Sequence, residues 1–250
     1  MSETPETTVP QPPVERVFPP WSVGRIVFWI AVGVFLSIPV GGIVGALVTA
    51  AGIWLDVGVG PDLVQAATVL IEVVYGPFVF FLVFLLVKRK GFSMSDIWGP
   101  FFVKRSHLGL AILAGIFFMA TATFIARMSH LEIPPTPLSN WDWRLLLAFD
   151  LLTIAYMVPI AEEFLFRGLL YRALRFRCST SNSVLISSLV FALAHIQYLQ
   201  QPFYLMVLFL LSVVSACLLE RSRSLTSSAV FHVAFNAASV ITESLTYYAS

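Results

Sequence analysis

Several apolar runs in this chain are long enough to cross a membrane, and they constrain its fold more than any other feature. Runs of about 18 or more apolar residues are typical of transmembrane helices. Of the 250 residues, 58% are hydrophobic and only 12% are charged, against roughly 25% charged in a soluble domain. We therefore expect an all-α, polytopic helical membrane protein with about seven transmembrane helices. The predicted spans are 26–55, 66–87, 108–126, 145–166, 184–198, 203–219 and 225–245.

The first apolar run and the residues before it differ from the rest of the chain. Residues 1–20 hold six prolines among Ser, Thr and Glu, with almost nothing to bury, which predicts a disordered cytosolic tail. The run 26–55 is interrupted by Pro39 and by glycines as far as Gly45, so it is predicted to be tilted, kinked or split. Residues 21–250 are expected to form a single transmembrane domain.

Basic residues gather in alternate loops between the predicted spans. Because Lys and Arg are enriched in cytoplasmic loops, the N-terminus is predicted to be cytosolic and the C-terminus to lie outside the cell membrane. This topology explains the basic residues without a nucleic-acid partner. Cys178 and Cys217 fall at or near the cytosolic side, so we expect free thiols rather than a disulfide. The basic residues on the predicted cytosolic side are Arg16, Arg25, Lys88, Arg89, Lys90, Lys104, Arg105, Arg172, Arg175, Arg177, Arg221 and Arg223.

Charged and polar residues interrupt three of the predicted spans. Glu162 and Glu163 follow an apolar run, and Arg167 lies about one helical turn further on. A carboxylate inside a bilayer costs a few kcal/mol or more, so such residues are rare and usually functional. With a rise of about 1.5 Å per residue, Glu162, His195 and His232 lie roughly 15, 18 and 12 Å from the predicted cytosolic border. Their similar depth, near the middle of the hydrocarbon core, predicts one shared site.

Helical spacing indicates which of these residues face one another. Glu163 and Arg167 are at i and i+4 with the acid first, the better orientation for an ion pair, and a structural tie is the favoured interpretation of this pair. Glu162 points about 100° away around the helix and is expected to face a cavity. His232 and Asn236, also at i and i+4, share one helix face.

Most of these residues also have a purely structural interpretation when taken alone. His195 could hydrogen-bond a neighbouring helix, Asn236 could join two helices, and Phe191 is interpreted as packing. The functional prediction depends on the combination. Other polar residues are interpreted as rim, helix-contact or solvated loop-border groups: Glu72, Asp150, His107 and His130.

Three short motifs follow one another in the last four predicted spans. They are E-E-x-x-x-R at 162–167, F-x-x-x-H at 191–195 and H-x-x-x-N at 232–236. Their order and intervals resemble those of the CPBP family, which comprises CAAX proteases and bacteriocin-processing enzymes and is also called Abi. The resemblance covers about residues 145–240, the expected catalytic core.

The resemblance implies an endopeptidase that works inside the membrane on a membrane-associated protein or peptide. Eukaryotic members of the family remove the last three residues of prenylated CAAX proteins. Carried over to this chain, Glu162 would activate water with the help of His195, while His232 and Asn236 would stabilise the oxyanion. Glu163 belongs to the same catalytic set, and Arg167 and Phe191 would support it.

The sequence leaves the involvement of a metal open. If zinc is bound, the expected ligands are Glu162, His195 and His232, all of ligand types that zinc accepts. The zinc-helix signature H-E-x-x-H is absent from the sequence, which slightly favours a glutamate mechanism without a metal. No cofactor is firmly predicted.

Two other functions are compatible with a polar network at membrane depth. The chain could be a non-catalytic membrane scaffold or immunity protein, although a non-enzyme could lose any member of the set freely. It could also be a transporter with a proton relay through Glu162 and the histidines. The absence of internal repeats in the sequence weakens the transporter interpretation.

Overall fold

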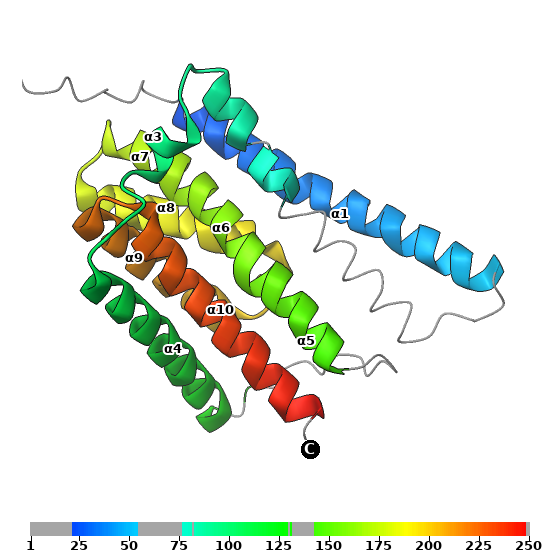
Figure 1. The fold of residues 1–250 in the computed structure, drawn as a ribbon. Coiled ribbons are helices and arrows are strands. Elements are labelled where there is room, and N and C mark those ends of the chain that lie inside the picture. Colours follow the sequence, from blue (N-terminus) through cyan, green and yellow to red (C-terminus); the bar gives the residue numbers. More distant parts are fainter. Residues whose placement is uncertain (1–21, 55–76, 82, 130, 132–142, 249–250) are drawn as a thin grey trace, which may run out of the picture.

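The computed structural model describes residues 22–54, 77–81, 83–129, 131 and 143–248. For residues 33–42 only the backbone is described. None of the described residues forms a strand (Figure 1). This confirms the predicted all-α class. The predicted tail, Glu72, His130 and most of the second span lie outside the described residues. A short unlabelled helix covers residues 77–88, and the remaining elements are α1 (Val23–Trp54), α3 (Met94–Trp98), α4 (Arg105–Met128), α5 (Trp143–Leu152), η1 (Thr153–Met157), α6 (Val158–Glu162), η2 (Glu163–Tyr171), α7 (Arg172–Arg175), α8 (Thr180–Ala194), η3 (Ile196–Tyr198), α9 (Pro202–Ser222) and α10 (Leu225–Tyr248).

The helices have the length and composition of a multi-pass membrane protein. Four described segments are long and apolar enough to cross a bilayer, namely Arg105–Met128, Trp143–Arg175, Pro202–Ser222 and Leu225–Thr246. Large apolar side chains on α4, such as Phe117 at 73% exposure, point away from the protein and suit contact with lipid. The exact number of seven spans and the orientation of the termini stay predictions.

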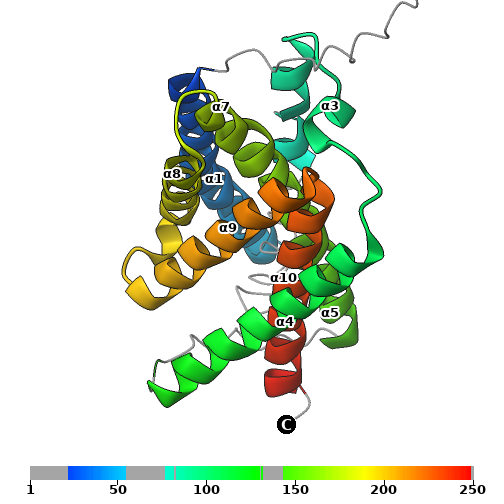
Figure 2. The same ribbon diagram turned by 90° about the vertical axis from the view of Figure 1, so that its left-hand side faces the viewer.

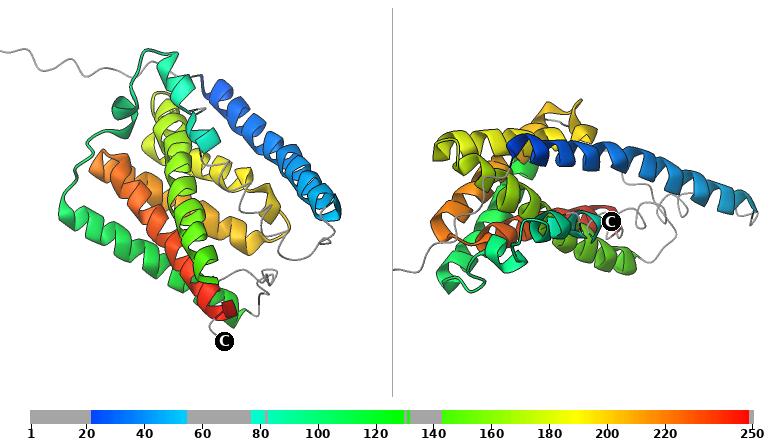
Figure 3. Two further views of the ribbon diagram at one scale, coloured as in Figure 1. Left: turned by 45° about the vertical axis from the view of Figure 1, so that its right-hand side comes forward. Right: turned by 90° about the horizontal axis from the view of Figure 1, so that it is seen from above.

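One rod of consecutive helices, from Trp143 to Arg175, forms the centre of the bundle. It joins α5, η1, α6, η2 and α7 without a break and runs past the predicted end at residue 166. Figures 1 and 3 show the rod between α10 and α1, with α4 beyond α10. The buried apolar core gathers around η2, where Leu169 and Leu170 are fully buried together with Phe191 of α8 and Phe231 of α10.

Two of the predicted spans differ from the observed helices. Helix α1 runs from Val23 to Trp54 without a break, so the predicted split is not observed. Helix α8 begins earlier than expected and ends at Ala194, so the prediction of a helix through residue 198 was wrong. His195 caps α8 with φ −92° and ψ 59°, and a short 3₁₀ turn follows. Fifteen residues rise only about 22 Å, so a helix that begins at the membrane border ends inside a core about 30 Å thick.

Helices α4 and α10 approach each other closely at two small residues of α4, and Figure 2 shows the two helices crossing. Ala111 and Gly115 are both buried and lie one turn apart. A Cβ atom at Gly115 would lie 2.5 Å from the carbonyl oxygen of Phe231 and 3.0 Å from the backbone nitrogen of Phe235. Small residues at such a crossing allow helix backbones to meet within a membrane.

Replacing Gly115 by alanine is therefore expected to destabilise the protein by about 1–3 kcal/mol, because α4 must move away from the α10 backbone. Unfolding of the purified protein in detergent, followed by circular dichroism, measures the change. Gly109→Ala on the same helix is the matched control, since a Cβ there meets nothing within 4 Å. Equal stability of the two variants would contradict the close approach.

Candidate active site

Three helical segments that are distant in sequence bring Glu162, His195 and His232 together. Nε2 of His195 lies 3.7 Å from Oε1 of Glu162, and Nε2 of His232 lies 3.8 Å from Oε2 of the same carboxylate. Glu162 and His232 are buried, whereas the His195 side chain keeps 17% of its surface exposed. The convergence predicted from helix rise is therefore present in the fold.

The hydrogen bonds of the two imidazoles determine which ring nitrogen carries a proton. Nδ1 of His195 lies 2.9 Å from the carbonyl oxygen of Phe191, and Nδ1 of His232 lies 3.0 Å from Oε1 of Glu163. A carbonyl and a carboxylate can only accept, so both Nδ1 atoms donate. The Nε2 atoms of both rings are directed at Glu162, the one acid among the described residues that the two histidines share.

Glu163 is fully buried and is surrounded by donors. Its Oε1 pairs with Nη1 of Arg167 at 3.2 Å and accepts from His232, and its Oε2 accepts a hydrogen bond from the Ser228 hydroxyl. The predicted ion pair with Arg167 is thus present. Because its oxygens already have partners, Glu163 is suited to holding His232 in place, and Glu162 remains the less engaged carboxylate.

Ser228 was missed by the sequence reasoning, although a signal for it exists. Ser228, His232 and Asn236 are spaced four residues apart on α10. Residues at i, i+4 and i+8 lie along one helix face, so the motif H-x-x-x-N extends backward by one turn to a buried hydroxyl. Ser228 is fully buried, and its hydroxyl donates its hydrogen bond to Glu163.

Phe191 connects the ion pair to both histidines. Its fully buried ring lies 4.6 Å from the guanidinium carbon of Arg167 and 4.7 and 5.8 Å from the ring centres of His195 and His232. A guanidinium over an aromatic face is attracted by the ring quadrupole, more strongly when desolvated. Phe191 is therefore packed in the protein interior as predicted, and its ring also contacts the buried guanidinium group of Arg167.

Asn236 forms a tie between α10 and the central rod. Its Nδ2 donates a hydrogen bond of 2.9 Å to the carbonyl oxygen of Ile154 in η1. In this π-helical turn the N–H of Val158 bonds to the carbonyl of Thr153, so the next carbonyl, that of Ile154, would take the N–H of residue 159. That residue is Pro159, which has no N–H, and Asn236 supplies the missing donor.

The remaining polar residues lie outside this cluster. Asp150 interacts electrostatically with Glu243 of α10, and it precedes Glu162 on the rod by about 18 Å of helix rise. His107 lies, half-buried, in the first turn of α4. Cys178 and Cys217 are free thiols in the structure.

The side chains do not form a metal-binding set in this geometry. Among the residues that the structure describes, no group of three or more His, Cys, Asp and Glu side chains is placed to hold a metal ion. Glu162, His195 and His232, the expected zinc ligands, are among these residues and do not form such a group.

Comparison with known proteins identifies a family model that matches the last part of the chain. Residues 144–238 match the family model described as type II CAAX prenyl endopeptidase Rce1-like. This confirms the resemblance to CAAX proteases that the three motifs indicated, and the matched residues include all of them. No curated protein and no solved structure matches the chain.

Removing the positive charge that neutralises Glu163 is expected to destabilise the fold strongly. Arg167→Met leaves a buried carboxylate without its cation, which costs about 3–5 kcal/mol. Adding Glu163→Gln to this variant should restore part of the loss. Unfolding free energies in mixed detergent micelles give the double-mutant cycle.

Arg175→Met is the matched control for this cycle. Arg175 pairs with Glu220 at 2.8 Å, but the two side chains keep 35% and 28% of their surface exposed. Partly exposed pairs of this kind contribute at most about 1 kcal/mol. If Arg167→Met were no more costly than Arg175→Met, the ion pair would have no special role in stability.

Proposed function

We propose that the chain is an intramembrane endopeptidase that hydrolyses peptide bonds of a membrane-associated substrate, including CAAX-type substrates, with a water activated by Glu162. The match of residues 144–238 to the Rce1-like family model supports this proposal. The observation that carries the proposal is the direction of two imidazole Nε2 atoms toward one buried carboxylate, that of Glu162. Separations of 3.7 and 3.8 Å are longer than hydrogen bonds, so these groups can share a water molecule bound beside them.

In this proposal Glu162 is the general base. The water is held between Glu162 and Nε2 of His195, which carries a lone pair because its Nδ1 is bonded to the Phe191 carbonyl. Glu162 takes one proton as the water oxygen attacks the substrate carbonyl carbon. The proton then passes to the departing amine nitrogen as the C–N bond breaks, so that a new carboxyl terminus and a new amine are released.

The oxyanion of the tetrahedral intermediate is assigned to His232 and Asn236. Donation from Nε2 of His232 requires the protonated ring, and Glu163 at Nδ1 supplies the counter-charge. The Nδ2 group of Asn236 has two protons, of which the bond to Ile154 uses one. The different partners of the two histidines, a neutral carbonyl and a carboxylate, thus support different roles for them.

Glu162→Gln is expected to abolish cleavage, because an amide cannot accept the proton of water. Cleavage would be measured in proteoliposomes with a mixture of membrane peptides that includes prenylated CAAX peptides and their unprenylated counterparts. A parallel sample with a metal chelator should keep full activity if the mechanism needs no metal. Loss of activity with chelator would indicate a metal-dependent reaction instead.

Glu243→Gln is the control for this substitution. Glu243 is also a carboxylate of the helical bundle, but it lies beside Asp150 rather than at the histidines, so its variant should cleave like the wild type. Identical products from the wild type and Glu162→Gln would contradict the role of Glu162 as the base.

Asn236→Ala is expected to lower kcat by about 10²–10³ with little change in KM, as is typical when one oxyanion donor is removed. Because Asn236 also ties α10 to the rod, the unfolding midpoint must be measured on the same sample. Ser239→Ala, which removes an exposed hydrogen bond to Glu243 on the same helix, should leave kcat unchanged. A loss of stability without a loss of kcat would limit Asn236 to its structural role.

A further inference from the structure

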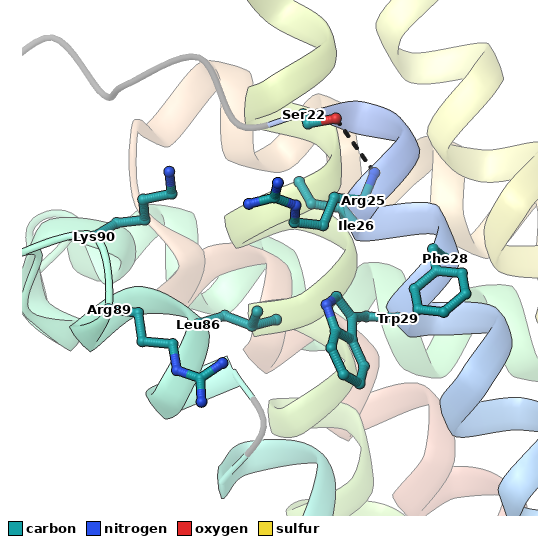
Figure 4. A pocket seen from close by; sticks show the side chains of 8 residues that line it. All are labelled: Ser22, Arg25, Ile26, Phe28, Trp29, Leu86, Arg89 and Lys90. Atoms are coloured by element: carbon teal, nitrogen blue, oxygen red, sulfur yellow. Dashed lines mark hydrogen bonds between the residues drawn. The ribbon is translucent and has the colours of Figure 1, made fainter.

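A second polar region lies at the start of α1, away from the glutamates and histidines of the site. Here α1 and the end of the helix 77–88 enclose a cavity of about 540 Å³, which Figure 4 shows from close by. The Arg25 side chain extends from α1 toward the segment that carries Arg89 and Lys90. The lining residues are Ser22, Arg25, Ile26, Phe28, Trp29, Leu86, Arg89 and Lys90.

The cavity carries three positive charges that the described part of the protein does not neutralise. Arg25, Arg89 and Lys90 are exposed, and none of them forms an ion pair with an acidic side chain among the described residues. Two of the three are guanidinium groups, whose planar fork matches the oxygens of a phosphate. Concentrated positive charge in a cavity favours an anionic ligand.

The other lining residues make the cavity amphipathic. Phe28 is 59% exposed, and it lies beside Trp29 in an edge-to-face contact with ring centres 5.6 Å apart. Ile26 and Leu86 complete the apolar part. Trp is enriched where a membrane helix meets the headgroup layer, because its ring combines an apolar body with a polar N–H.

The position of the cavity fits the border between membrane and water. Val23–Val32 and Pro77–Lys88 are apolar helices, and the three cations lie at the ends of these helices. This end of the protein holds the start of α1 and the basic residues after Val87, which the charge distribution predicts to lie on the cytosolic side. Basic pockets between transmembrane helices on that side are suited to anionic lipid headgroups.

We propose that this cavity binds the phosphodiester headgroup of an anionic phospholipid. Arg25, Arg89 and Lys90 contact the phosphate, and Phe28 and Trp29 contact the glycerol and the first methylene groups of the acyl chains. The volume of about 540 Å³ is within the range of ligand pockets and exceeds the needs of a free phosphate ion. The apolar wall likewise favours a lipid over a free anion.

Native mass spectrometry of the full chain in a neutral detergent tests the proposal without requiring protease activity. The chain is titrated with phosphatidylglycerol, with phosphatidylcholine and with inorganic phosphate. We expect saturable binding of phosphatidylglycerol at least tenfold tighter than that of phosphatidylcholine. Each Lys or Arg near an anionic lipid contributes roughly a fivefold change in affinity, so the triple variant Arg25→Gln, Arg89→Gln, Lys90→Gln should weaken this binding roughly a hundredfold.

A second triple variant, Lys104→Gln, Arg105→Gln, Arg177→Gln, removes the same charge from exposed positions on the same predicted side and should retain the affinity within about threefold. If the first triple variant does not fold, Arg25→Gln and Arg89→Gln singly should each weaken binding roughly fivefold. Equal losses in the two triple variants, or equal binding of the two lipids, would overturn the proposal. Displacement of phosphatidylglycerol by an equal concentration of phosphate would overturn it in favour of a free-anion site.

Discussion

The buried negative charge of Glu163 is the constraint on which the rest of the site depends. A lone carboxylate at this depth would cost several kcal/mol, so it must be neutralised and hydrogen-bonded within the protein. Arg167 supplies the charge from the same helix, and Ser228 and His232 supply hydrogen bonds from α10. The network therefore joins the central rod to α10 beside Glu162, His195 and His232.

The same network gives the two adjacent glutamates different chemistry. Glu163 has its oxygens occupied, and it fixes the ring of His232 with Nε2 directed at Glu162. Glu162, one residue earlier, is turned toward the histidines and forms no such hydrogen bond with the described residues. In the proposed reaction Glu162 acts as the base, while Glu163 orients the imidazole of His232.

The sequence predicted the all-helical class, the meeting of Glu162, His195 and His232, and the Glu163–Arg167 pair, because these follow from hydropathy, helix rise and i,i+4 spacing. It did not predict the end of α8, since the chain remains largely apolar through Leu199 and hydropathy alone cannot detect the break. The π-helical turns were also missed. Arguments based on 3.6 residues per turn assume the α geometry, which η1 and η2 do not have.

The end of α8 at His195 links the fold to the proposed reaction. Backbone that leaves the helix at membrane depth is tolerated only where it is buried in protein or faces a polar cavity. A peptide bond that is to be hydrolysed must also be presented outside a helix, and its exposed N–H and C=O groups need the same kind of surroundings. His195 lies at this break and is more exposed than Glu162 and His232, so in the proposed reaction the substrate would approach the site here.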